Sequence, residues 1–305
     1  MKRVFNINLH YACNNACINC ISHNTKSNSS SIISVTNIQN LLENFVPKEE
    51  DIIILSGGEP SLYPDLISLL QLIRKHTSCQ IVMYTNGFGL CSEIITEAIV
   101  RYINRVTISF YGNDSVHDFY AGKIGAFSTL KSAIHKFCKL RTKFKSKCLL
   151  ELKYVSPPIG TPILSILDSI SSSHEIDSIV LSRILTINNY EFTKYQIDDI
   201  TISNINLLQY QDRYKNIPLK LVDLLPCTLG NQLFNEIFNS NPQRLAYEIL
   251  FFDGNHPEGM PIQFAKSASF SARCALCKLK TICGTTLTCY GALCKFHGKW
   301  HYADE

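Results

Sequence analysis

Short apolar segments alternate with helical patterns along the first 185 residues, and this alternation constrains the fold more than any other feature. Strand-like segments lie at 4–9, 52–55, 80–84, 105–110, 148–155 and 178–182. Between them, the segments 61–76, 92–103, 127–140 and 162–170 place apolar residues at helical spacing. Near-continuous apolar strands separated by helices predict a parallel α/β sheet with both faces covered. The pattern fits a partial or complete (β/α) barrel or an open doubly wound sheet, and periodicity alone does not choose between them.

The pattern changes after residue 185. Residues 186–216 are mostly polar, and strand-like segments follow at 217–225, 249–253 and 260–264. The sequence Asp253-Gly254-Asn255 is a turn signal before the last of these. We therefore expect a larger domain at 1–190, a connecting region at 191–216 and a small cysteine-rich domain at 217–305. The polar stretch 22–34 reads as a loop, because it lies between two core elements.

Composition excludes several classes of protein. The chain has 305 residues, of which 46% are hydrophobic and 18% charged, which argues against disorder and coiled coil. Its net charge of +4 is mild and demands no acidic partner, so nucleic acid is not expected. The N-terminus lacks the apolar region of a signal peptide, and no apolar run approaches the roughly 18 residues of a membrane span. We expect a cytoplasmic protein that does not contact a membrane.

Cysteine is over-represented, with 13 residues. In a chain of this length without a secretion signal, such a number favours metal or catalytic thiolates over disulfides. Cys13, Cys17 and Cys20 form a C-x3-C-x2-C motif directly after the first predicted strand. Four thiolates normally close a [4Fe–4S] cluster, whereas three leave one iron open to another ligand. The alternatives are a zinc site completed by His10 or His23, and a set of unrelated core cysteines.

A second motif follows the second predicted strand. Residues 56–60 read Ser-Gly-Gly-Glu-Pro and lead into a helical segment. Two glycines at the carboxyl end of a buried strand let a ligand approach the backbone, and a carboxylate there can accept from an ammonium group. Alone, this sequence could be only a tight turn. Downstream of the three-cysteine motif and at a strand end, it is far more specific.

Together these motifs resemble the radical S-adenosylmethionine (radical SAM) superfamily. The resemblance implies a partial (β/α)6 barrel in which Cys13, Cys17 and Cys20 bind a [4Fe–4S] cluster. It also implies that the open iron binds the amino and carboxylate groups of S-adenosylmethionine, whose reductive cleavage gives a 5′-deoxyadenosyl radical. By the same resemblance, the segment Gly57, Gly58, Glu59 and Pro60 lines the methionine pocket, and the Glu59 motif contacts the ammonium group.

Further positions extend the resemblance. Thr85, Asn86 and Gly87 match a turn that relatives place beside the cofactor, and residues 109–112 resemble the SxDG stretch of peptide-modifying members. Ser109 is therefore expected to contact the ribose or carboxylate of S-adenosylmethionine. His117 and Asp118 either take part in the site or simply order their loop. Many relatives have an aromatic residue before the third cysteine, where this chain has Asn19, so the contacts to adenine are left open.

A second group of cysteines lies near the C-terminus. Cys274, Cys277 and Cys283 form a C-x2-C-x5-C array, and Cys227 lies upstream. This array resembles the SPASM and shorter twitch extensions of peptide maturases, which implies one auxiliary [4Fe–4S] cluster on these four cysteines. Cys289 and Cys294 are either ligands of a second, incomplete cluster or cysteines with a purely structural role. Spacing alone fits a structural zinc site equally well. The remaining cysteines, which lie in or beside predicted core elements, are Cys79, Cys91, Cys138 and Cys148.

The resemblance implies a radical SAM maturase that modifies a ribosomally made peptide, with weak similarity to maturases of His-Xaa-Ser systems. The modification would be a crosslink, a thioether, an epimerised centre or an oxidation. Expected partners are the precursor peptide and a reductase or flavodoxin-type electron donor. Since only 12 residues precede Cys13, recognition of a leader peptide, if the reaction needs one, is expected to come from the core or from a separate protein. One alternative is a radical SAM enzyme acting on a small molecule or on a protein residue, as sulfatase maturases do. Another is a non-catalytic protein that binds zinc or nucleic acid.

Overall fold

The computed structural model describes residues 2–20, 31–157, 163–170, 175–183, 214, 216–222, 247–261, 292–296 and 299–303. The first half contains β1 (Lys2–Asn8), α1 (Val35–Phe45), β2 (Ile52–Ser56), η2 (Pro60–Leu62), α2 (Leu66–His76), β3 (Gln80–Thr85), η3 (Phe88–Cys91), α3 (Glu93–Tyr102), β4 (Arg105–Phe110), α4 (Asp114–Ala121) and α5 (Ala126–Lys143). The second half contains β5 (Leu149–Ser156), α6 (Ile163–Ser169), β6 (Ser178–Arg183), β7 (Leu219–Val222), β8 (Tyr247–Phe252), β9 (Met260–Pro261), β10 (Ala292–Phe296) and β11 (Lys299–Ala303).

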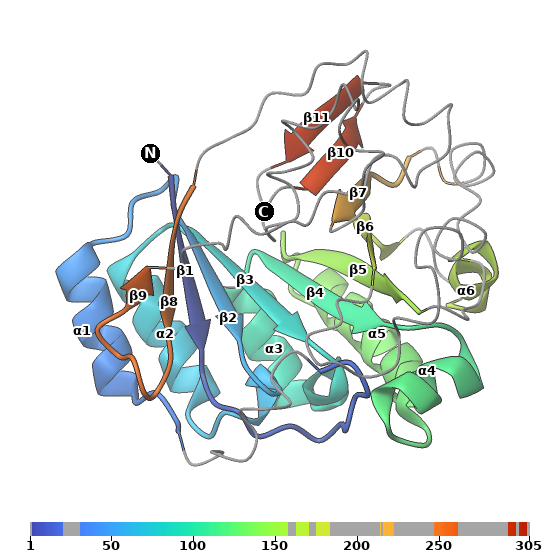
Figure 1. Ribbon diagram of the computed structural model, residues 1–305, viewed down its shortest axis with the longest axis horizontal. Helices are drawn as coiled ribbons and strands as arrows, with labels where there is room; N and C mark the ends of the chain where they lie inside the picture. Colours follow the sequence, from blue (N-terminus) through green and yellow to red (C-terminus); the bar gives the residue numbers. More distant parts are fainter. Residues whose placement is uncertain are drawn as a thin grey trace, which may run out of the picture.

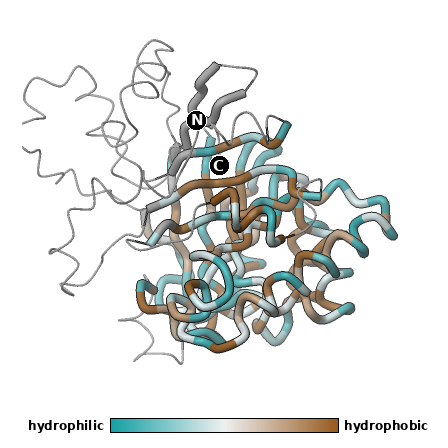
Figure 2. Tube along the Cα trace, turned by 90° about the vertical axis from the view of Figure 1, so that its right-hand side faces the viewer, coloured by the Kyte–Doolittle hydropathy of each residue, from teal (hydrophilic) through white to brown (hydrophobic). Residues whose placement is uncertain are grey.

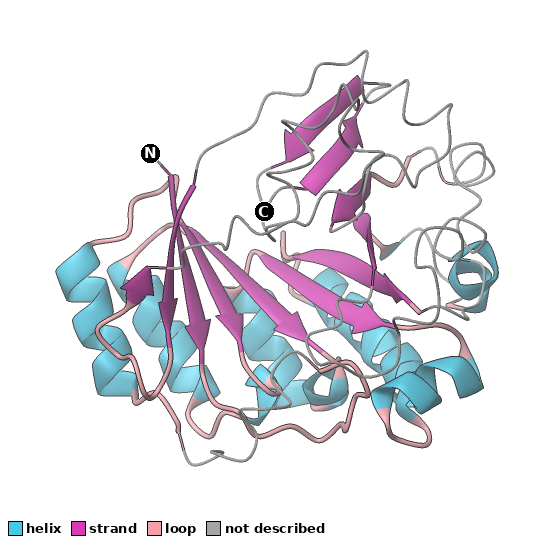
Figure 3. Cartoon of the chain, in the orientation of Figure 1, coloured by secondary structure: helices cyan, strands magenta, loops and turns pink. Residues whose placement is uncertain are grey.

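The described strands form one sheet in the order β11-β10-β7-β6-β5-β4-β3-β2-β1-β8-β9 (Figure 1). The eight neighbouring strands from β8 to β7 are parallel, whereas β9, β10 and β11 pair antiparallel at the two ends. The predicted parallel α/β fold is thus confirmed. The six strands predicted before residue 185 are β1 to β6, and the helices lie on one side of the sheet (Figure 3).

The main core lies between the sheet and these helices. Alternate strand residues such as Phe5, Ile7 and Leu9 point toward the helices, because side chains in a strand alternate between its two faces. Figure 2 shows long hydrophobic stretches along the strands, whereas hydrophobic and hydrophilic residues alternate along the helices. The opposite face of the sheet carries a smaller cluster of Val4, Ile52, Ile54 and Val82.

That opposite face also buries charge. The carboxylate of Glu151 on β5 accepts hydrogen bonds from Thr107 Oγ1 at 2.9 Å, Ser178 Oγ at 2.7 Å and Lys220 Nζ at 2.5 Å. Arg105 Nε lies 3.8 Å from the same carboxylate. Burial opposes ionisation of Glu151, but these cations hold the pKa of its carboxyl group below the ordinary value. The network joins β4, β5, β6 and β7 near their amino ends, so strands distant in the sequence are held by a satisfied buried charge.

Two helices were not predicted. Helix α1 begins at the N-cap Ser34, whose hydroxyl accepts from Asn37 N, and it buries Ile38, Leu41 and Leu42. Helix α4 buries His117, Tyr120 and Ala121 and ends at Gly122. The predicted helix at 61–76 is shorter than expected, because the chain first forms the 3-10 turn η2 and α2 begins only at Leu66. Leu62, which lies within the segment predicted to be helical, is therefore 37% exposed.

The described strands of the segment 217–305 extend the main sheet. β7 pairs with β6, and β8 lies parallel to β1 with Val4 opposite Ile249. The predicted turn after β8 is confirmed, since the Asp253 carboxylate accepts from Asn255 N at 2.9 Å and His256 N at 2.8 Å. The boundaries predicted at 190 and 216 fall in residues that are mostly outside the described part of the chain. No helix among the described residues is long and apolar enough to cross a lipid bilayer.

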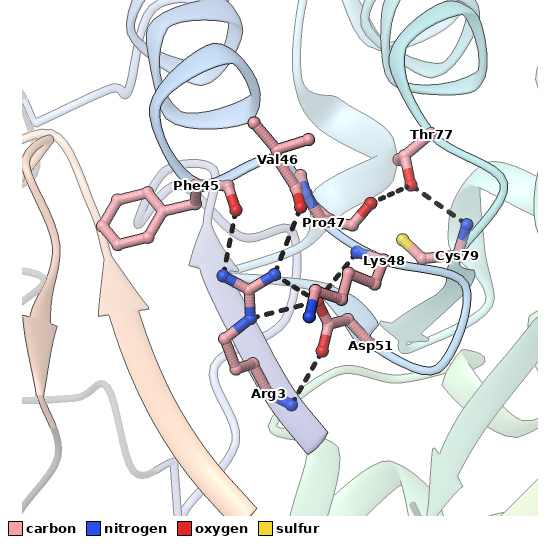
Figure 4. Close-up of polar contacts among 8 residues, drawn as sticks. All are labelled: Arg3, Phe45, Val46, Pro47, Lys48, Asp51, Thr77 and Cys79. Carbon is pink, nitrogen blue, oxygen red and sulfur yellow. Dashed lines mark hydrogen bonds and ion pairs between the residues drawn. The ribbon is translucent and has the colours of Figure 1, made fainter. Parts of the chain in front are cut away.

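Arg3 fastens the amino end of β1 to the loop before β2 (Figure 4). Its guanidinium contacts the Asp51 carboxylate at 2.6 Å and donates to the carbonyl oxygens of Phe45 and Val46. Asp51 is 1% exposed and also accepts from Lys48 N at 2.8 Å. Burial opposes the ionisation of Asp51, but the bonds from Arg3 and Lys48 hold its pKa below the ordinary value.

Replacing Asp51 by Asn should lower the free energy of unfolding by about 2 kcal/mol at neutral pH, because a buried charge-assisted contact is lost. Since the folded-state pKa of Asp51 is depressed, its contribution is present above about pH 4 and is lost as the pH falls through the folded-state value. Denaturant titrations of wild type and Asp51→Asn at several pH values would measure this. The exposed Asp65 has no side-chain cap bond, so Asp65→Asn is the matched control. A stability difference that does not shrink on acidification would contradict the assignment.

Candidate functional site

The motifs found in the sequence follow strands whose carboxyl ends lie at the same edge of the sheet. The cysteine loop follows β1, the Gly57-Gly58-Glu59 turn follows β2, Asn86 follows β3 and Tyr111 follows β4. In parallel α/β sheets, ligands bind outside the carboxyl ends of the strands. The fold therefore brings the predicted residues to the edge where a ligand site is expected.

The Gly57-Gly58 turn packs directly against the chain that enters the cysteine loop. Gly58 N donates to His10 O at 2.7 Å, and Glu59 N donates to Ala12 O at 2.9 Å. A Cβ on Gly57 would lie 2.4 Å from His10 O, and one on Gly58 would lie 2.1 Å from Ala12 O. The structure thus explains why glycine is needed at both positions, which the sequence alone did not show. They are needed for the close approach of the cysteine loop, in addition to any approach of a ligand.

Glu59 joins this turn to the next strand. Its carboxylate is fully buried and accepts from Thr85 Oγ1 at 2.6 Å, Asn86 N at 2.7 Å and Ser61 N at 3.0 Å. Burial raises the pKa of Glu59 above the ordinary value, and these hydrogen bonds oppose that rise. Pro60, also buried, begins η2 directly after it. Thr85 Oγ1 in turn accepts from Gly87 N at 3.0 Å, which shapes the turn after β3.

Helix α4 holds the other side of the cysteine loop. Ala16 N donates to Ala121 O at 3.1 Å, and Ile18 N donates to Tyr120 O at 3.0 Å. Gly122 has a φ of +60°, and a Cβ there would lie 2.2 Å from Ala16 O. The loop is therefore clamped between the turn after β2 and the end of α4. This helix was not predicted, because His117 and Tyr120 occupy two of its three buried positions and do not form a hydrophobic stripe.

Cys13, Cys17 and Cys20 are partly exposed in this clamped loop and form no disulfide. Asn15 N donates to Cys13 Sγ at 3.4 Å, and Asn86 Nδ2 lies 3.8 Å from the same sulfur. Within the described residues, no three His, Cys, Asp or Glu side chains converge closely enough to hold a single metal ion. A cubic cluster makes no such demand, because each thiolate binds a different iron.

Tyr111 was singled out only as part of a motif, where it stands at the aspartate position of the SxDG stretch. Its hydroxyl has a side-chain hydrogen bond with Cys17. The pKa of Tyr111 is raised well above the ordinary value. Burial is the largest cause, and the nearby thiols of Cys17, Cys20 and Cys13 raise it further. Tyr111 therefore lies beside the cysteines.

His117 and Asp118 both have structural partners. His117 Nδ1 accepts from Tyr111 N at 3.2 Å, and burial lowers the pKa of His117 to about 4, against a smaller opposing effect of Asp118. The Asp118 carboxylate accepts from Gly125 N at 2.5 Å and Phe127 N at 2.8 Å, which caps the start of α5. These contacts support the interpretation that the pair orders its surroundings.

Ser109 lies on the face of β4 opposite the helices, because its neighbours Ile108 and Phe110 belong to the main core. It is in register with Lys153 of β5, whose Nζ lies 5.9 Å from the ring centroid of Tyr84. A hydroxyl and an ammonium group thus lie on the face of the sheet opposite the helices, called the inner face below, near the carboxyl ends of β4 and β5. Such groups suit a carboxylate or a sugar hydroxyl.

The segment after β8 contacts the residues that lead from β1 into the cysteine loop. Tyr11 donates its hydroxyl hydrogen to Asp253 Oδ2 at 2.6 Å, and burial followed by Asp253 raises the pKa of Tyr11. His10 donates through Nε2 to Glu59 O at 3.0 Å, so this nitrogen is committed to the turn. His23, the other residue considered for a zinc site, lies outside the described residues.

The auxiliary-cluster prediction falls mostly outside the described part of the chain. Cys227, Cys274, Cys277, Cys283 and Cys289 belong to segments that are not described, and Cys294 lies in β10 opposite His301. Of the cysteines predicted to be core residues, Cys79, Cys138 and Cys148 are buried and Cys91 is partly buried. The four-cysteine ligand set stays a prediction.

The residues that contain the clamped cysteine loop match a known protein family. Residues 7–149 match the model of the Radical SAM superfamily. The chain contains a radical SAM domain. The cysteine motif and the Gly57-Gly58-Glu59 turn both lie within the matched residues.

Two curated relatives come from one branch of radical SAM chemistry. The AdoMet-dependent heme synthase of Methanosarcina barkeri is 27% identical over 134 residues, which are 44% of this chain and 38% of the relative. The pre-heme d1 synthase of Dinoroseobacter shibae is 28% identical over 134 residues, which are 44% of this chain and 33% of the relative. The matched stretch therefore spans 38% of one relative and 33% of the other.

The similar solved structures come from another branch. Streptococcus suis SuiB bound to the precursor peptide SuiA has a TM-score of 0.58 at 15% identity, covering 82% of this chain and 57% of SuiB. The enzyme anSMEcpe with bound AdoMet and the peptide Kp18Cys has a TM-score of 0.54 at 18% identity, covering 70% and 62% of the two chains. At these identities the likeness shows the radical SAM fold alone.

The residues brought together fit S-adenosylmethionine and a cluster. Asn8 Oδ1 at the end of β1 is buried without a hydrogen-bond partner in the described structure. It lies 2.8 Å from the position of a Cβ on Gly57, beside the turn assigned to the methionine end of the cofactor. An acceptor left without a donor in that place suits the N–H or O–H groups of the cofactor.

Two glycine-to-alanine variants can separate the effect of a steric clash at the Gly57-Gly58 turn from the effect of backbone strain. We expect Gly58→Ala to lower the free energy of unfolding by about 2 kcal/mol and to reduce iron bound after anaerobic reconstitution, because its Cβ would displace Ala12. Gly125 has a φ of +78° but no atom within 4 Å of its Cβ position, so Gly125→Ala should cost only about 1 kcal/mol and leave iron binding unchanged. Chemical denaturation and iron analysis measure both effects. Equal iron content in the two variants would refute the steric role of Gly58.

Proposed function

We propose that this protein is a radical SAM enzyme that modifies a ribosomally made peptide. The observation that carries the proposal is the clamped cysteine loop. Main-chain hydrogen bonds from the turn after β2 and to the end of α4 fix the loop at the carboxyl edge of a parallel sheet. The match of residues 7–149 to the Radical SAM superfamily supports the same chemistry.

In this proposal Cys13, Cys17 and Cys20 hold the [4Fe–4S] cluster. S-adenosylmethionine lies beside Gly57, Gly58 and Pro60, with Thr85, Asn86 and Ser109 as further contacts. When both groups are bound and an electron is supplied, they provide a radical that removes hydrogen from an unactivated C–H bond.

The chain itself positions these groups. Glu59 is fully buried and accepts from Thr85 and Asn86, so we assign it the role of fixing the turn whose main chain meets the methionine end. Ser109 and Lys153 offer a hydroxyl and a cation on the inner face, which suit the ribose and carboxylate groups.

The peptide substrate is supported by the solved relatives, which include SuiB bound to the precursor peptide SuiA. A small-molecule substrate is the second candidate, because the curated relatives are named as heme synthases. We further propose one auxiliary [4Fe–4S] cluster on Cys227, Cys274, Cys277 and Cys283. A reductase or flavodoxin-type protein would supply the electron, and a separate protein would recognise a leader peptide.

Anaerobically reconstituted protein with dithionite should convert S-adenosylmethionine to 5′-deoxyadenosine and methionine, measured by liquid chromatography. Cys20→Ala should abolish this product, because the cluster loses one of its ligands. Cys79→Ala is a matched control at a buried cysteine away from the loop, and it should retain cleavage. Protein that contains zinc but no iron or sulfide would refute the enzyme and favour a non-catalytic zinc protein.

The substrate class is tested with synthetic peptides encoded beside the gene, incubated with the active enzyme. We expect one of them to change in mass in a reaction that needs S-adenosylmethionine and fails with Cys20→Ala. Mass spectrometry with fragmentation locates the altered residue. If the enzyme cleaves S-adenosylmethionine yet every peptide keeps its mass, the peptide assignment fails. Turnover of a tetrapyrrole in the same assay would then establish the small-molecule alternative.

A further inference from the structure

The orientation of the Asn86 amide is fixed by its neighbours. Phe88 N donates to one end of this amide, Oδ1, at 2.9 Å. Because a main-chain N–H requires an acceptor, that end must be the oxygen, and the NH2 group must point the other way. It points to Asn14 Oδ1 at 2.8 Å and toward Cys13 Sγ at 3.8 Å.

The orientation of Asn14 follows from that of Asn86. Since Asn14 accepts through Oδ1, its own NH2 group lies at the opposite end of the amide. This Nδ2 is buried and has no acceptor in the part of the chain that the structure describes. The Nδ2 of Asn19, directly before Cys20, is in the same situation. Burying a donor without an acceptor is unfavourable, which points to an acceptor that the described residues do not themselves supply.

Both asparagines lie in the loop between Cys13 and Cys20. The acceptors that the proposed function places there are sulfur atoms of the cluster and, less directly, the carboxylate of S-adenosylmethionine. Both are anionic acceptors, but Asn14 directly follows one cluster ligand and is bonded to Asn86, whose amide already faces the Cys13 sulfur. The geometry therefore favours cluster sulfur.

We propose that Asn14, Asn19 and Asn86 form a set of amide donors to the cluster sulfurs and that this set raises the reduction potential of the cluster. The inference rests on the proposed function. Reduction adds negative charge to the cluster, and N–H donors stabilise the more negative state. These residues are positioning groups for electron transfer, and they act without contacting the substrate.

The test is a redox titration of the reconstituted protein, followed by electron paramagnetic resonance of the reduced cluster without S-adenosylmethionine. Asn14→Ala should shift the midpoint to a more negative potential. Asn14→Asp keeps the oxygen that accepts from Asn86 but lacks the donor, so it should also shift the midpoint negatively while preserving the loop. Asn40, exposed on α1, provides the control variant Asn40→Ala, which should titrate as wild type.

Wild-type potentials in both Asn14 variants, at full iron content, would overturn the inference and leave the proposed function intact. A difference that arises only after S-adenosylmethionine is added would also overturn it, because the donors would then serve the carboxylate of the cofactor. Failure of the wild-type protein to bind iron and sulfide would instead refute the proposed function, and this inference with it. Asn14→Asp also adds a negative charge, so if Asn14→Ala loses the cluster, Asn19→Ala is the deciding variant. A wild-type midpoint in Asn19→Ala would then overturn the inference.

Discussion

The buried carboxylate of Glu59 is the interaction on which the site depends, because it connects segments that follow different strands. Its oxygens hold Thr85 and Asn86 after β3, and its main-chain N–H holds Ala12 after β1. A carboxylate without solvent exposure persists only where donors surround it. The positions of the cysteine loop, the glycine turn and the Asn86 turn are therefore set together, and none of them is an independent loop.

The amino and carboxyl ends of the parallel strands carry different kinds of polar residues. At the amino ends of the strands, Arg3 pairs with Asp51, and Glu151 pairs with Lys220 and Arg105. These charges are paired within the protein. At the carboxyl ends, buried polar atoms such as Asn8 Oδ1 lack partners in the described structure. The ion pairs and the residues proposed to bind the cofactor thus lie at opposite ends of the same strands, as is usual for parallel α/β folds.

The parallel fold and the residues at its carboxyl edge could be predicted from the sequence, because apolar strand runs and the cysteine and glycine motifs are local patterns. The roles of those residues could not. Gly58 is required by Ala12, and Glu59 is satisfied by Thr85 and Asn86, so these roles depend on contacts across the fold. Helix α4 was missed since His117 and Tyr120, two of its buried residues, do not read as a hydrophobic stripe.

The pairing of β8 with β1 has a consequence for how the protein assembles during synthesis. The hydrogen bond between Tyr11 and Asp253 joins residues 242 positions apart. A growing chain exposes its cysteine loop long before the ribosome has made the strand that lies beside β1, and closing so long a loop is slow. Of the contacts that hold this loop, the bond between Tyr11 and Asp253 therefore forms late in translation, after those to the turn after β2 and to α4. Delivery of iron and sulfide to nascent chains would meet a different surface from that of the finished protein.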